Sequence, residues 1–164
     1  MKPSIAMTAI MAIALVGTAS FNVPPIFVWN ASPSVPVGLY VVVPISTLSL
    51  GDLALVDPPR ALTKYLSRRE YLSAGTPMLK RIAALSGQHV CRTGRVIRID
   101  GLVRATAQHR DARERLLPAW SGCDQLQSDE VFFLNNAPNS LDGRYFGPLK
   151  CDTIGGQAIP LWTR

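Results

Sequence analysis

The sequence predicts a mainly β domain with one short helix, preceded by an apolar N-terminal segment. Three observations indicate this fold class. Short apolar runs rich in β-branched residues lie between turn residues, an Asp-Gly pair separates two alternating runs, and thirteen prolines and twelve glycines are spread along the chain. With 164 residues, the chain has room for one compact domain and a short appendage.

The N-terminal segment is apolar over Ile5–Phe21, and no charged side chain occurs between Lys2 and Asp52. An apolar stretch of about 20 residues can cross a bilayer as a helix, and its positive end stays inside. We therefore expect residues 1–24 to form a membrane anchor or a cleavable signal segment, with residues 25–164 as the exported domain. The alternative is a buried helix at the start of a cytosolic domain.

The body of the chain alternates strand patterns with one helical pattern. Four segments are predicted to be strands: Val37–Pro44, Asp52–Pro58, Val96–Ala105 and Glu130–Asn136. The third of these is predicted to be a hairpin, because Asp100-Gly101 favours a two-residue turn between its halves. Arg60–Ser73 has apolar residues at helical spacing, whereas Thr76–Gly87 fits a strand or a helix equally well.

The net charge of +6 is not concentrated in a pattern typical of nucleic-acid binding. Arg92–Arg115 contains seven arginines, but acidic residues are mixed among them and no aromatic residue is present. Without aromatic side chains this segment has no platform on which bases could stack. The pattern favours a solvated or lipid-facing surface, and nucleic acid is not an expected partner.

Several kinds of chemistry have no support in the sequence. There is no CxxC pair, HExxH motif, EF-hand loop or P-loop, so neither a metal nor another cofactor is expected. The two histidines, His89 and His109, lie in the arginine-rich stretch and not beside a nucleophile-elbow motif. We interpret both as structural or surface residues.

A hydrolase can work without histidine if a buried lysine is neutral and acts as the general base. Lys80, within PMLKRIAAL, is the lysine best placed for burial, although the local sequence alone favours a lysine that extends from a strand into solvent. Ser32 and Ser34 lie between prolines just after the apolar segment, with Gly38 and a strand following them. Taken alone, this stretch would be a proline-rich linker.

Together, four segments resemble the sequence boxes of TraF-type conjugative transfer peptidases, a branch of the signal peptidase I superfamily. They are NASPSVPVGLY (Asn30–Tyr40), GDLALVDP (Gly51–Pro58), MLKRIAALSGQHV (Met78–Val90) and FFLNNAPNSLDGRYFGPL (Phe132–Leu149). The chain departs from the pattern at Val35, where Met or Ile is commoner, and at Gly87-Gln88, where many relatives have Gly-Asp. The resemblance implies a signal peptidase-like β-sheet body.

The resemblance also implies a serine endopeptidase with a Ser–Lys dyad. Ser34 takes the position of the nucleophile and Lys80 that of the general base. The Ser34 N–H and the Ser32 hydroxyl take the positions of the oxyanion-hole donors, although Ser32 fits a simple turn residue equally well. Asp142 and Arg144 match a supporting pair of the last box, and they also fit an ordinary ion pair at a turn.

Further expectations concern the disulfide, the location and the partners. The resemblance implies a disulfide between Cys91 and Cys123, with Cys151 unpaired. The three cysteines fit an oxidising compartment. It implies a location in the bacterial inner membrane, with the catalytic domain on the periplasmic side. The expected partners are inner membrane lipid, the conjugative transfer apparatus and an exported preprotein, in particular a pilin precursor that is hydrolysed or cyclised. The alternatives are a housekeeping type I signal peptidase and a non-enzymatic, membrane-anchored assembly subunit of a conjugation channel.

Overall fold

The computed structural model describes residues 27–164, so the expected anchor at residues 1–24 lies outside the described residues. The strands are β1 (Phe27–Asn30), β2 (Gly38–Val43), β3 (Leu53–Val56), β4 (Met78–Ala84), β5 (His89–Thr93), β6 (Val96–Ile99), β7 (Leu102–Thr106), β8 (Gly122–Gln125), β9 (Glu130–Phe133), β10 (Leu149–Lys150) and β11 (Ile154–Thr163). The helices are α2 (Arg60–Arg68), α3 (Gly143–Phe146) and the 3₁₀ turn η1 (Cys151–Thr153). Within this range, no helix combines the length and the apolar character that a bilayer span requires. The mainly β fold class is confirmed.

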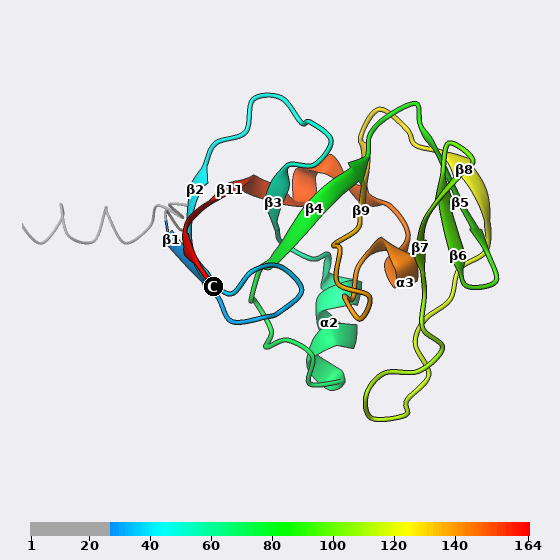
Figure 1. The fold of residues 1–164 in the computed structure, drawn as a ribbon, viewed down its shortest axis with the longest axis horizontal. Helices are drawn as coiled ribbons and strands as arrows, with labels where there is room; N and C mark the ends of the chain where they lie inside the picture. The colour runs from blue at the N-terminus through cyan, green and yellow to red at the C-terminus, as the bar shows by residue number, and fades with distance from the viewer. Residues whose placement is uncertain (1–26) are drawn as a thin grey trace, which may run out of the picture.

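The larger sheet has the strand order β1-β2-β11-β3-β4-β9-β10, and every pairing in it is antiparallel (Figure 1). Because side chains alternate along a strand, each face of this sheet carries its own apolar cluster. Tyr40, Leu53 and Leu79 belong to one cluster, whereas Ile82 and Phe133 belong to the other. Lys80 lies between Leu79 and Ile82 on β4, where both faces of the strand are covered.

The smaller sheet has the order β7-β6-β5-β8 and packs beside the larger one (Figure 1). Its inward side chains Val90, Ile97 and Ile99 form an apolar cluster with Phe132 of β9. The hairpin predicted at Asp100-Gly101 is confirmed, because both residues have a positive φ and β6 pairs with β7 on either side of them. This second sheet is the lateral support of the site described below.

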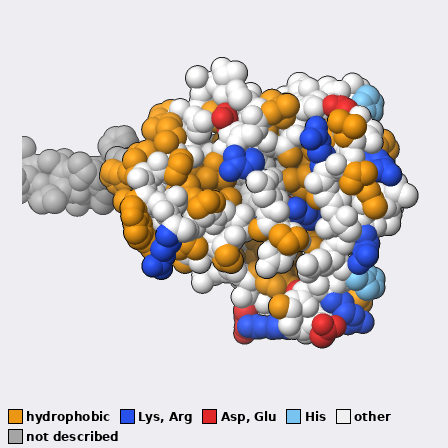
Figure 2. All heavy atoms as spheres, in the orientation of Figure 1, with side chains coloured by type: hydrophobic (Ala, Val, Ile, Leu, Met, Phe, Trp, Pro, Cys, Tyr) orange, Lys and Arg blue, Asp and Glu red, His pale blue; other side chains and the backbone are white. Residues whose placement is uncertain are grey.

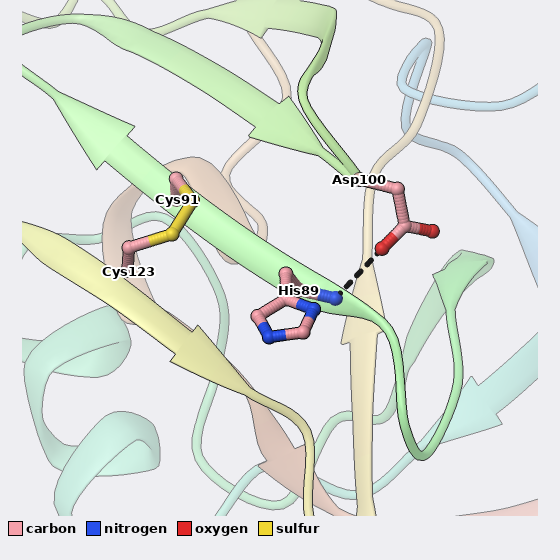
Figure 3. Close-up of a disulfide and its surroundings, with 4 residues drawn as sticks. All are labelled: His89, Cys91, Asp100 and Cys123. Atoms are coloured by element: carbon pink, nitrogen blue, oxygen red, sulfur yellow. Dashed lines mark hydrogen bonds between the residues drawn. A yellow bond between two sulfur atoms is a disulfide. The ribbon is translucent and has the colours of Figure 1, made fainter.

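A disulfide joins Cys91 on β5 to Cys123 on β8, which lie opposite each other in the ladder (Figure 3). This is the pair expected from the resemblance, and Cys151 remains a half-buried free thiol. Figure 3 also shows the backbone N–H of His89 bonded to Asp100 at 2.8 Å. Asp100 closes the β6–β7 turn, so this bond holds that turn against β5.

The predicted helix was too long, because α2 ends at Arg68 and not at Ser73. Glu70 adopts the left-handed conformation, with φ 58°, and its N–H bonds to the carbonyl of Ser67 at 3.0 Å. The Tyr71 N–H bonds back to the carbonyl of Leu66 at 2.9 Å. These two bonds form a Schellman termination, which satisfies the last helical carbonyls and turns the chain away.

The ambiguous segment Thr76–Gly87 is resolved as the strand β4, which begins at Met78. The strand predicted over Glu130–Asn136 is three residues shorter and ends at Phe133. The reason is that β9 pairs with only the second half of β4, and beyond that point the Asn135 side chain takes over its hydrogen bonds. This early end of the ladder leaves the first half of β4 open on one edge.

Candidate active site

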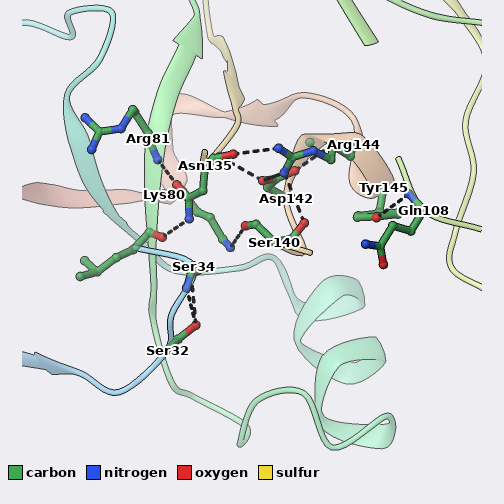
Figure 4. A network of polar contacts seen from close by, with 12 residues as sticks. Ser32, Ser34, Lys80, Arg81, Gln108, Asn135, Ser140, Asp142, Arg144 and Tyr145 are labelled. Atoms are coloured by element: carbon green, nitrogen blue, oxygen red, sulfur yellow. Dashed lines mark hydrogen bonds and ion pairs between the residues drawn. The ribbon is translucent and has the colours of Figure 1, made fainter. Parts of the chain in front are cut away.

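A cavity of about 550 Å³ lies between the β1–β2 loop, the start of β4 and the loop that leads to α3. Ser34 lines it from the first of these segments, Lys80 from the second and Ser140 from the third. Leu66 and Tyr71, at the end of α2 and just after it, form a further wall. Four segments that are far apart in the sequence therefore meet around one cavity. Figure 4 shows Ser34, Lys80 and Ser140 from three of them.

Asn30, the last residue of β1, determines the shape of the loop that carries Ser34. Its amide group is buried and donates hydrogen bonds to three carbonyl oxygens, those of Ser32, Val35 and Pro36, at 2.7, 3.1 and 3.0 Å. Its carbonyl oxygen accepts from the Ser32 N–H at 3.1 Å. A turn containing two prolines lacks two backbone donors, so one side chain supplies the bonds that the backbone cannot make.

Ser34 is partly buried, and its closest polar neighbour is Ser32. The Ser32 hydroxyl donates to the Ser34 Oγ at 3.1 Å and accepts from the Ser34 N–H at 3.3 Å (Figure 4). The two donors that the resemblance assigns to an oxyanion hole therefore lie side by side at the opening. They bond to each other in this state and would have to turn towards an arriving carbonyl oxygen.

Lys80 is the buried lysine that the site requires, since only 5% of it is exposed. Burial lowers the pKa of its amine from 10.5 to about 8, an effect that the nearby Asp142 carboxylate opposes and the Arg144 guanidinium reinforces. The expectation that a strand lysine reaches solvent is therefore wrong for this position. With a pKa of about 8, a minor fraction of the Lys80 amine is neutral at pH 7 and about half of it at pH 8. A neutral amine can accept a proton.

Ser140 is the residue that bonds the Lys80 amine, at 3.3 Å between Nζ and Oγ, and it was not singled out from the sequence. It is buried, and its N–H bonds to the carbonyl of Ala137 at 3.1 Å. Lys80 Nζ makes no hydrogen bond to Ser34 within residues 27–164, although both groups face the same cavity. Catalytic hydrogen bonds are often long before the substrate is bound, so this spacing fits a resting state.

Asp142 and Arg144 form a buried ion pair with 2.5 Å between the Asp142 Oδ2 and the Arg144 Nη1. Asp142 also caps α3, because its Oδ1 accepts from the Arg144 N–H at 3.2 Å. Burial raises the pKa of Asp142, and the adjacent Arg144 guanidinium opposes that shift. The pair is therefore a structural clasp behind the lysine and does not itself border the cavity.

Asn135 connects this clasp to the strand that carries the lysine. Its side chain accepts from the Arg81 N–H at 2.8 Å and donates to the Leu79 carbonyl at 3.1 Å, so it grips β4 on both sides of Lys80. Its backbone N–H bonds to Asp142 at 3.0 Å and its carbonyl accepts from Arg144 at 2.8 Å. Each of its polar groups is used, and only 1% of the residue is exposed.

The second sheet supports the clasp from the outer side. Arg92 on β5 is buried and donates to the carbonyl of Arg144, and Trp120 donates to the carbonyl of Gly143 at 2.9 Å. The Tyr145 hydroxyl accepts from the Gln108 N–H at 2.9 Å. Thus the arginine-rich stretch contributes one buried structural arginine here.

The remaining sequence expectations concern histidine and metal. His89 and His109 are both exposed, in agreement with their interpretation as surface residues. Among residues 27–164, no group of three or more His, Cys, Asp or Glu side chains is arranged to hold a metal ion. Lys80 and Tyr71 are the titratable side chains that line the cavity, and of these Lys80 is the one whose pKa lies near neutral pH.

Two glycines of the motifs are required by close packing. A Cβ on Gly143 would lie 2.6 Å from the Phe132 ring and 2.7 Å from the Phe133 carbonyl oxygen. A Cβ on Gly38 would lie 2.0 Å from the Trp162 carbonyl oxygen, where β11 crosses the start of β2. No larger side chain fits at either position without moving the backbone.

Comparisons with known proteins identify the family of the chain. The model of the family described as signal peptidase, peptidase S26, matches residues 2–162. The chain belongs to this family. It is 34% identical to a probable conjugal transfer protein TraF of Sinorhizobium fredii, over 99% of this chain and 90% of that protein. It is also 30% identical to a plasmid transfer protein TraF of Escherichia coli, over 76% of each chain.

The match to the signal peptidase family spans all four of the boxes identified in the sequence. Among solved structures, a signal peptidase I from Enterococcus faecalis aligns with a TM-score of 0.41 and 20% identity, over 69% of this chain and 97% of that one. The relatives named TraF are described as conjugal or plasmid transfer proteins. The family match and these relatives thus establish the family.

Proposed function

We propose that this protein is a serine endopeptidase that uses Ser34 as its nucleophile and Lys80 as its general base to process an exported precursor of a conjugation system. The observation that carries the proposal is the burial of Lys80 beside the cavity that Ser34 also lines. A buried amine with a lowered pKa has few structural uses, because burial of a charged lysine destabilises the fold. Its value is as a base near neutral pH.

In the acylation step, the Ser34 Oγ attacks the scissile carbonyl carbon while the neutral Lys80 amine takes the hydroxyl proton. The carbonyl oxygen becomes an oxyanion that accepts hydrogen bonds from the Ser34 N–H and the Ser32 hydroxyl. Collapse of this intermediate breaks the peptide bond, and the Lys80 ammonium gives its proton to the leaving amine. An acyl-enzyme on Ser34 remains, with Lys80 neutral again.

In the second step, Lys80 accepts a proton from the incoming nucleophile, which attacks the ester carbonyl of the acyl-enzyme. The ester bond to Ser34 then breaks, and the Lys80 ammonium returns the proton to the Ser34 Oγ. If the nucleophile is water, the product is a free carboxylate. If it is the amino terminus of the substrate, the product is a cyclic peptide. The Ser140 hydroxyl, 3.3 Å from the amine, keeps Lys80 directed into the cavity in both steps.

The open edge of β4 suggests how the substrate binds. The Leu79 carbonyl and the Arg81 N–H point away from β3, since Asn135 bonds both of them. In an antiparallel strand, every second residue directs its backbone N–H and carbonyl groups to the same edge. The Leu79 N–H and the Pro77 carbonyl therefore also point to the edge that faces away from β3, at a position where β9 no longer pairs with β4. An extended substrate can therefore add a strand there and present its scissile bond to Ser34 and Lys80.

We further propose that the protein is held at the bacterial inner membrane with the catalytic domain on the periplasmic side. The apolar, charge-free start of the sequence supports this location. Hydrophobic side chains gather over β1, β2 and β11 at the end of the molecule where the described chain begins (Figure 2). Trp29 and Trp162 stack there with ring centroids 5.9 Å apart, and both are about half exposed, which is typical of a membrane interface.

The location is tested by proteolysis of spheroplasts from cells that produce the full chain with a C-terminal tag. Under the proposal, added protease removes the tag in intact spheroplasts, and the untreated protein sediments with the membranes. Recovery of the tagged protein in the soluble cytosolic fraction would contradict it.

The reaction is tested by co-expressing the full chain with the pilin precursor of its transfer system and following the precursor by gel and by mass. Ser34→Ala and Lys80→Ala should each abolish processing, whereas Ser86→Ala and Lys64→Ala, which alter an exposed serine and an exposed lysine, should not. A product lighter than the linear form by one water indicates cyclisation. Full processing by folded Ser34→Ala and Lys80→Ala proteins would instead favour a non-enzymatic assembly subunit.

A further inference from the structure

The β7–β8 connection contains a small hairpin of residues 109–117, here called the arginine hairpin. Its two arms meet at a bridge between Arg110 and Leu116, and the Leu117 N–H bonds to the His109 carbonyl at 3.0 Å. Glu114 at its tip has φ 58°, a left-handed conformation that destabilises a non-glycine residue by about 1 kcal/mol or more. Since exposed loops rarely keep such a conformation, something else must hold the tip in place.

Asp111 holds the arginine hairpin together from within. Its carboxylate accepts bonds from the backbone N–H groups of Arg113 and Arg115, both at 2.9 Å, and from the Arg115 guanidinium at 2.7 Å. The Asp111 side chain is 8% exposed. It also accepts a hydrogen bond from the Tyr71 hydroxyl, which lies outside the hairpin.

The arginine hairpin is docked on the segment that follows α2. Arg69 donates to the Leu116 carbonyl at 3.0 Å, and Arg115 donates to the Arg69 carbonyl at 3.1 Å. The Arg115 guanidinium also lies over the Tyr71 ring, 4.9 Å from its centroid. An exposed ion pair joins Arg113 to Glu70, the left-handed residue that ends α2.

The docked segment is a wall of the cavity. Tyr71 and Leu72 line it, together with Leu66 from α2, and they stand where the chain leaves the helix for β4. The segment from Arg69 to Pro77 belongs to no helix or strand. Without external support, its position would be set mainly by the Schellman termination at its start.

We propose that the arginine hairpin determines the side-chain selectivity of the cavity by fixing Tyr71 and Leu72 through the Tyr71–Asp111 hydrogen bond. This inference rests on the proposed function, because it assigns a role in substrate choice to a wall of the proposed substrate cavity. Within the described residues, no hydrogen bond or ion pair joins the hairpin to Ser34 or Lys80. The hairpin therefore acts on which side chains fit, and not on the proton transfer.

The size of the effect follows from the limits of apolar pockets. One methylene more or less in such a pocket changes kcat/KM by roughly 10–200-fold, provided that the walls do not yield. If Tyr71 and Leu72 are no longer held in place, this wall of the cavity can move and admit larger substrate side chains. The discrimination between small and large side chains then falls. The Tyr71 hydroxyl is a single atom that makes this link, and it can be removed without removing the ring.

The test uses Tyr71→Phe and a set of internally quenched peptides built on the bond that the protein cleaves in the co-expressed pilin precursor. The peptides differ only in having Ala, Val or Leu at each of the three positions before that bond. Tyr71→Phe should lower the Ala-to-Leu ratio of kcat/KM by about 5-fold or more at one position, in line with a loosened pocket. The change should arise mainly in KM, and the pH midpoint of kcat/KM should stay at its wild-type value.

Two further variants make the result specific. Asp111→Asn removes the charge of the acceptor and should shift the ratio in the same direction, and the double variant should add little to either single change. Tyr65→Phe is the matched control. The ring centroids of Tyr65 and Tyr71 lie 6.1 Å apart, but the buried Tyr65 hydroxyl has no hydrogen-bond partner among residues 27–164. Tyr65→Phe should leave the ratio unchanged.

An unchanged ratio in folded Tyr71→Phe and Asp111→Asn proteins would overturn the inference. An equal loss for all peptides would overturn it as well, since that is the signature of general destabilisation. If the wild-type protein cleaves no peptide in a Ser34-dependent manner, the proposed function fails and the inference fails with it. If cleavage is Ser34-dependent but Tyr65→Phe alters the ratio as Tyr71→Phe does, only the inference fails.

Discussion

The two halves of the candidate site are built in opposite ways. The loop that carries Ser34 is partly open to solvent, and one side chain, Asn30, supplies most of its internal hydrogen bonds. The half that carries Lys80 is buried, and it is tied to the Asp142–Arg144 pair through Asn135. A second sheet then supports that pair from outside.

The difference follows from what each group would have to do. A nucleophile must be reached by a polypeptide substrate, so its loop cannot be covered. A lysine base must be deprived of water to be neutral, so its surroundings must be closed and well packed. The comparison predicts that substitutions around Lys80 change both the free energy of unfolding and the rate of processing. Substitutions in the loop should change mainly the rate.

Replacement of the base should produce the largest effect. Lys80→Met keeps the length of the side chain and removes the amine, so precursor processing should fall by about 10³-fold or more, as expected when a general base is lost. The same change should not destabilise the protein. Burial of an ionised lysine whose pKa falls from 10.5 to about 8 destabilises the fold by about 3 kcal/mol at pH 7.

The size of this destabilisation depends on pH. Between pH 8 and 10.5 the unfolded chain holds more protons than the folded one at Lys80, so the free energy of unfolding rises with pH across that window. In Lys80→Met this rise should disappear and the variant should be more stable than wild type at pH 7, as measured by urea unfolding. Lys64→Met, at an exposed site on α2, is the control. A Lys80→Met protein less stable than wild type at pH 7 would contradict the assigned burial.

Loss of the clasp should be the next largest effect, and it should appear as lost stability. Asp142→Ala leaves the Arg144 guanidinium buried without its ion pair, which lowers the free energy of unfolding by about 3–5 kcal/mol. Asp129→Ala removes an exposed ion pair with Lys150, which is worth about 0–1 kcal/mol. Chemical denaturation of both variants measures the contrast. Similar losses for the two would show that the clasp does not have the structural role described.

The loop should respond mainly in rate. Asn30→Asp keeps the shape of the side chain but loses the donors to three carbonyl oxygens, so kcat should fall by about 10–100-fold through misplacement of Ser34. KM should stay within about 3-fold, because the open edge of β4 is untouched. Asn136→Asp, at an exposed position, should behave as wild type. A rise in KM with an unchanged kcat would show that Asn30 shapes substrate binding instead.

The sequence predicted local features better than non-local ones. The β6–β7 hairpin could be found because its turn chemistry is contained in two residues, and β3 because its apolar run is continuous. By contrast, β11 lies between β2 and β3 in the sheet, yet it contains two glycines and Pro160 and has no strand signature. Register shifts within β11 accommodate these residues, and such shifts depend on the neighbouring strands.

The candidate site shows the same division. Ser34 and Lys80 could be proposed because their motifs are short and resemble a family. Asn135 and Ser140 could not, because the partner that gives each its role lies far away in the chain. Asn30 could not either, because an asparagine beside a turn is common, even though its partners are local. The burial of Lys80 is likewise a property of the packed strands around it, and not of the residues beside it.

The pH dependence of kcat/KM for precursor processing tests the dyad most directly. If neutral Lys80 is the base, log kcat/KM rises with a slope of about 1 at low pH and levels off above an apparent pKa near 8. A rate that does not change between about pH 6 and 9, or a midpoint near the 10.5 of an exposed lysine, would contradict a buried Lys80 as the proton acceptor of Ser34.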